Sequence, residues 1–94
     1  MSYSFLITAD TKEEATGKIR DQFDAVVASQ PIHAADKEAA VIAAQAFVRI
    51  LADPHEGDEI YVNVYGSLGW RYDSPDEFLS AGLTINASLR NKSK

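Results

Sequence analysis

Three observations predict a two-layer α+β domain. Hydrophobic residues alternate along three segments and recur at helical spacing along two further segments, and a chain of 94 residues, 46% hydrophobic, suits one core. The order is β-α-α-β-β, and a helical hairpin returns the chain to the end of the sheet that it left. We therefore expect a three-stranded antiparallel sheet with its strands in sequence order and both helices on one face. We assign residues 1–90 to this single domain and residues 91–94 to a flexible tail.

The first half of the chain predicts one strand and two helices. Residues 2–9 alternate, which predicts a strand with Tyr3, Phe5 and Ile7 facing the core. A helix then begins at Thr11, whose hydroxyl and the Glu14 carboxylate form a capping box. Its inward positions are Ala15, Ile19, Phe23, Val26 and Val27.

A second helix is predicted from about Ala35 to Ala52, after Pro31 and before Asp53-Pro54. The segment is rich in alanine. The inward stripe that we expect consists of Ala43, Phe47, Ile50 and Leu51.

The second half predicts two strands with a short helical turn between them. One parity of the first strand is apolar and faces the core: Ile60, Val62, Val64, Leu68, Trp70 and Tyr72, with Gly66 among them. A β-bulge between Gly66 and Gly69 would turn Trp70 to the opposite face. Ser74-Pro75 starts the helical turn, which ends near Ser80. The last strand places Leu83, Ile85, Ala87 and Leu89 inward and Thr84, Asn86, Ser88 and Arg90 outward.

Composition narrows the classes of function. The chain has no cysteine, no basic leader with an apolar run, and no 18-residue apolar segment, so we expect a cytoplasmic protein that does not span a membrane. The net charge of −5 argues against nucleic acid as a partner. Residues 61–94 are less acidic, with three acidic and four basic residues.

No catalytic, cofactor or metal motif is present, and we expect no enzyme activity and no cofactor. The chain lacks a Gly-X-Ser-X-Gly elbow and a glycine-rich phosphate loop. His33 and His55, the two histidines, lie in predicted loops, and the acidic residues around His55 do not follow the ligand pattern of a calcium site. These loop charges are better explained as a solvated surface.

Two surfaces are candidates for interaction. The open face of the sheet carries Tyr61, Asn63, Tyr65, Arg71 and Arg90, and such a face can stack bases or sugars or can pair with a second copy. A solvated sheet face also carries residues of this kind without any ligand. The first strand, which includes Phe5, is a predicted edge, yet it has no charge from Met1 to Ala9.

We therefore expect a small interaction module, a homodimer or an accessory subunit, with a protein partner or self-association. The alternative is a site for a small ligand or for single-stranded nucleic acid around Tyr61 and Tyr65.

Overall fold

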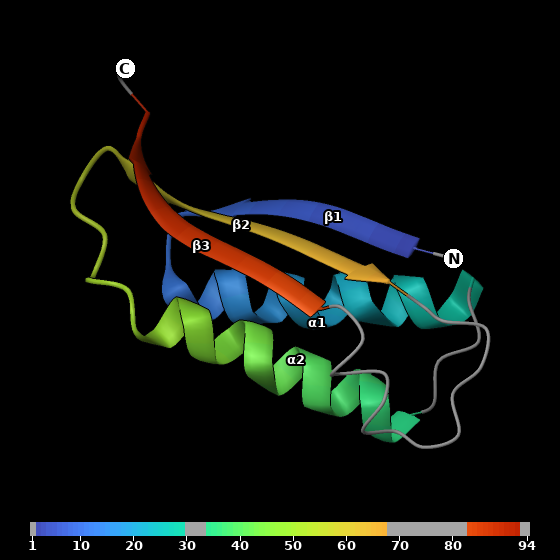
Figure 1. Ribbon diagram of the computed structural model, residues 1–94. Coiled ribbons are helices and arrows are strands. Elements are labelled where there is room, and N and C mark those ends of the chain that lie inside the picture. Colours follow the sequence, from blue (N-terminus) through green and yellow to red (C-terminus); the bar gives the residue numbers. More distant parts are fainter. Residues whose placement is uncertain (1, 30–33, 68–82, 93–94) are drawn as a thin grey trace.

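The computed structural model describes residues 2–29, 34–67 and 83–92, and these form three strands and two helices (Figure 1). The elements in chain order are β1 (Ser2–Ala9), α1 (Lys12–Ser29), α2 (Ala34–Arg49), β2 (Asp58–Ser67) and β3 (Leu83–Asn91). The predicted order β-α-α-β-β is confirmed. Leu68, Trp70, Arg71 and Tyr72, the bulge at Gly69, the helical turn at 74–80 and His33 lie outside the described residues.

The sheet is antiparallel in the order β1-β2-β3, as predicted. The register places Val62 of β2 between Ile7 of β1 and Ala87 of β3. Both helices run beneath the same face, antiparallel to each other (Figure 1). β2 is therefore the central strand and β1 is an edge.

The start of α1 confirms most of the predicted cap. The Glu14 amide donates to the Thr11 hydroxyl at 3.1 Å. The Glu14 carboxylate, however, accepts from the amide of Asp10 at 3.4 Å, one residue before the amide that a regular capping box would use. Ala15, Ile19 and Phe23 are buried, as their spacing predicts.

The inward stripe predicted for the second helix is confirmed only in part: Leu51 packs against the core and Ala43 is half-buried, but Phe47 and Ile50 are exposed. The buried residues are Ala40, Val41, Ala44 and Val48, whereas Phe47 is 44% exposed and Ile50 is 79% exposed. Because this helix is apolar on several sides, its pattern did not determine which side faces the core. The structure turns small side chains toward a layer that already holds the ring of Phe23.

α2 also ends earlier than predicted, at Arg49 instead of near Ala52. The Lys12 ammonium, in the first turn of α1, donates to the carbonyls of Arg49 at 3.2 Å and of Leu51 at 2.5 Å, and it pairs with Asp53 at 3.3 Å. A cation at the carboxyl end of a helix satisfies carbonyls that have no partner within the helix. Lys12 thus joins the start of one helix to the end of the other.

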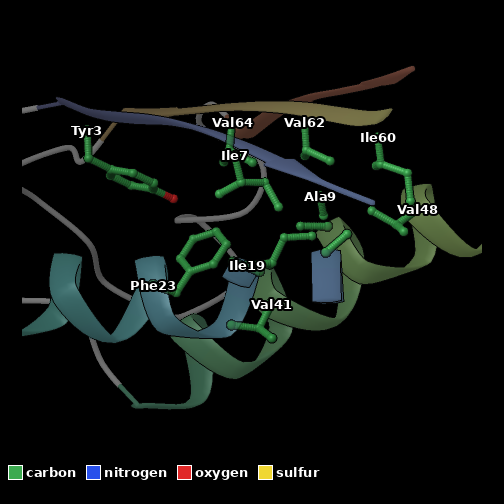
Figure 2. Close-up of a cluster of buried hydrophobic side chains, with 13 residues drawn as sticks. Tyr3, Ile7, Ala9, Ile19, Phe23, Val41, Val48, Ile60, Val62 and Val64 are labelled. Atoms are coloured by element: carbon green, nitrogen blue, oxygen red, sulfur yellow. The ribbon is translucent and has the colours of Figure 1, made fainter. Parts of the chain in front are cut away.

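The core lies between the sheet and the helices, and Phe23 is central to it (Figure 2). Its ring meets those of Tyr3 at 6.0 Å and Phe5 at 5.1 Å between centroids, both edge to face. Tyr3 crosses over Gly66 of the neighbouring strand so closely that a Cβ there would overlap the ring. Gly66 is needed for this approach.

β3 is alternately half-buried and exposed from Leu83 to Arg90, in the predicted phase. The strand extends through Asn91, one residue into the segment assigned to a tail. Beyond it the Lys92 ammonium donates to the Asp10 carboxylate, which lies just after β1.

Candidate interaction surface

The open face, the side of the sheet away from the helices, is uncharged across its centre. Its rows follow from the register: Ser4, Tyr65 and Thr84; Leu6, Asn63 and Asn86; Thr8, Tyr61 and Ser88. All nine side chains are neutral. Most are hydroxyls and amides that water solvates well, so the face by itself is compatible with a solvated surface.

The two tyrosines of this face differ in how much ring surface they offer. The Arg90 guanidinium carbon lies 3.7 Å from the centroid of the Tyr61 ring, a cation-π contact that covers one side of that ring. The Tyr65 ring is half exposed. The structure therefore brings Tyr61, Asn63, Tyr65 and Arg90 to one face. Of the two described tyrosine rings on it, Tyr65 is the more accessible for stacking.

Phe5 belongs to the other side of the sheet. Its side chain is half-buried and packs edge to face on Phe23. The backbone of Phe5 lies on the edge strand, whereas its ring packs against the core. Arg71, the remaining predicted site residue, lies outside the described residues.

A hydrogen bond at the far end of the sheet determines which residues of β1 direct their amides and carbonyls toward β2 and which direct them outward. The Lys92 amide donates to the Gly57 carbonyl at 2.7 Å, which continues the β2-β3 ladder by one pair. Hydrogen-bonded and non-hydrogen-bonded pairs alternate in an antiparallel ladder, so odd-numbered residues of β2 bond to β3 and even-numbered ones bond to β1. The partners of the latter are the odd-numbered residues of β1. The amides and carbonyls of Ser4 and Leu6 consequently point away from the sheet.

These four backbone groups are the open part of the β1 edge. Within the described residues, neither the amide nor the carbonyl of Ser4 or Leu6 has a hydrogen-bond partner on that side. The next outward carbonyl, that of Thr8, accepts from the Lys18 ammonium at 2.7 Å. One end of the edge is thus closed by a helix side chain, and the stretch before it is unprotected.

A groove runs beside this edge, between β1 and α1. Its volume is about 340 Å³, and it is lined by Leu6, Ile7, Thr8, Lys18, Asp21 and Gln22. Helical spacing puts Lys18, Asp21 and Gln22 outside the inward stripe of α1, but nothing in that pattern indicates that they lie next to the edge strand. Leu6 borders the groove through its place on the edge strand, and its half-exposed side chain lies on the open face of the sheet.

The acidic loop before β2 has structural contacts. Asp58 accepts from the backbone amide of His55 at 3.0 Å and from the side-chain amide of Asn91 at 3.3 Å. In the part of the chain that the structure describes, no three His, Asp or Glu side chains gather as a metal site would require.

No protein-family model, curated protein sequence or solved structure matches this chain. Neither α1 nor α2, the helices within the described ranges, is long and apolar enough to span a membrane.

Proposed function

We propose that this chain is a non-enzymatic protein-interaction module that binds an extended segment by strand addition at β1. The observation that carries this proposal is the unpaired backbone of Ser4 and Leu6 on an edge strand without charge. Native edges are generally protected by charges, prolines or bulges, and an unprotected edge is a template for another strand.

The binding free energy of such a strand would come mainly from backbone hydrogen bonds. An added antiparallel strand would bond to both groups of Ser4 and of Leu6, and each hydrogen bond contributes about 0.5–1.5 kcal/mol net. These bonds require only an extended backbone, so the side chains beside them decide which segment binds.

The edge is better supported than the open face. Arg90 already covers the Tyr61 ring, and the nine central side chains of that face are small, neutral or amide-bearing. The edge, in contrast, has backbone donors and acceptors that a partner can satisfy.

The test uses full-length, isotopically labelled protein and seven-residue peptides of alternating valine and polar residues, in basic, acidic and neutral forms. We expect at least one form to slow amide hydrogen exchange at Ser4 and Leu6. Ser4→Pro should abolish the protection of the Leu6 amide. The proline removes the outward amide at position 4 and leaves the ladder to β2 intact. Tyr65→Ala, on the open face, is the control and should keep it.

Two results would overturn strand addition. One is that millimolar concentrations of every peptide leave exchange at Ser4 and Leu6 unchanged. The other is that Tyr65→Ala removes peptide binding while Ser4→Pro, shown to be folded by circular dichroism, retains it, which would move the site to the open face.

A further inference from the structure

We infer that the segment bound at β1 is a basic stretch of a different protein, with Lys or Arg on the side that faces α1. This inference rests on the proposed strand addition. Two features favour this occupant: the position of α1 beneath β1 and the charge on the helical wall of the groove.

The position of α1 beneath β1 disfavours a second copy of this domain paired antiparallel to β1. α1 lies beneath β1 (Figure 1). Its Phe23 ring meets the Phe5 ring, and its Lys18 ammonium donates to the outward carbonyl of Thr8. Paired antiparallel strands of two copies would lie about 4.7–4.9 Å apart with both helix layers on the same face. Packed helices need about 8–10 Å between their axes. A single strand without a helix beneath it fits this space.

The alternation of an added strand determines which of its side chains meet the helix. Residues opposite Ser4 and Leu6 direct their side chains to the open face, beside the half-exposed Leu6. Residues opposite Phe5 and Ile7 direct theirs to the helix side. There they meet the wall of Lys18, Asp21 and Gln22.

The charge available on that wall is negative. Lys18 is engaged by the Glu14 carboxylate at 3.0 Å and by the Thr8 carbonyl at 2.7 Å. Asp21 is exposed and has no ion pair with any other described residue. Residues 1–60 contain eleven acidic and five basic residues, so the surrounding field also favours a cation. A Lys or Arg on the helix side of the added strand satisfies Asp21.

The partner segment is therefore defined by chemistry. It has about five extended residues without proline, an apolar side chain next to Leu6 and a basic side chain opposite Asp21. Its remaining affinity comes from backbone hydrogen bonds.

The test compares the basic and acidic peptides on the full-length chain at low and high salt. We expect the basic peptide to bind about threefold to fivefold more tightly at low salt, the range of an exposed ion pair, with the difference shrinking at 1 M salt. Asp21→Lys should reverse the preference. Glu13→Lys makes the same charge change on the same helix, outside the groove, and should leave the order of affinities unchanged.

The outcomes separate this inference from the proposed function. Equal protection of Ser4 and Leu6 by basic and acidic peptides, insensitive to Asp21→Lys, would overturn the basic partner and retain strand addition. Protection that rises with protein concentration in the absence of peptide, together with a dimer in light scattering, would replace the foreign segment by a second copy. No protection under any condition would overturn both.

Discussion

β1 and β3 are the two edges of one sheet, and their charges are arranged differently. β1 has no charged residue along its length, and the cation that contacts its Thr8 carbonyl, Lys18, comes from a helix. β3 carries Arg90, which lies over Tyr61, and Lys92 follows it and bonds to Asp10. The end of β3 is thus fixed to the rest of the fold by its own charges. β1 depends on the packing of its inward rings and keeps its backbone available.

The largest expected effect comes from removing the ring that supports β1. Phe23→Ala should lower the free energy of unfolding by about 3–5 kcal/mol, because both Tyr3 and Phe5 pack against that ring. Denaturant unfolding measures the loss. Native-state hydrogen exchange should accelerate more at Phe5 and Ile7 than at Asn86, whose amide bonds to β2 in the same ladder phase. Equal acceleration in β1 and β3 would contradict the specific support of β1 by this ring.

A smaller loss is expected from Gly66→Ala, at the crossing of β1 and β2. The new Cβ would overlap the Tyr3 ring, and such overpacking costs about 1–3 kcal/mol as the ring is displaced. Gly17→Ala is the matched control. No atom lies within 4 Å of its added Cβ, and the change should raise stability by up to about 1 kcal/mol. Thermal unfolding of the two variants should shift in opposite directions, and a shift of the same sign would contradict the tight crossing.

The smallest expected effects are electrostatic, one at each edge. The hydrogen bond from Lys92 holds the pKa of the Asp10 carboxyl below its ordinary value of 3.8, and the hydrogen bond from Lys18 holds the pKa of Glu14 below 4.5. A carboxyl with a lowered folded pKa contributes stability that is present above its unfolded pKa. That contribution is lost as the pH falls through the folded value.

Carboxyl titration by NMR checks these pairs. Lys92→Ala should raise the pKa of Asp10, and Lys18→Ala should raise that of Glu14 and also free the Thr8 carbonyl. If Lys18→Ala leaves the pKa of Glu14 unchanged, the cation at the β1 edge is not held as the structure shows.

Much of the fold could be predicted because its strands and first helix alternate between apolar and polar residues. Ile60, Val62 and Val64 are buried and Tyr65 is half exposed, as their parity requires. α2 could not be predicted in the same way. Its alanines make several sides equally apolar. In the packed structure the side with Ala44 and Val48 is buried, and the side with Phe47 is exposed.

The candidate site also has features that follow from the sequence and features that depend on tertiary packing. The sequence alone determined that β1 is uncharged and that Tyr61 and Tyr65 share a face, since both statements follow from residue type and a period of two. Only the tertiary structure decided that Arg90 covers Tyr61, that Lys18 closes the edge at Thr8, and that Asp21 stands in a groove beside Leu6. These contacts join residues of different elements, and their geometry depends on how α1 packs beneath the sheet and on the strand register, which local patterns do not specify.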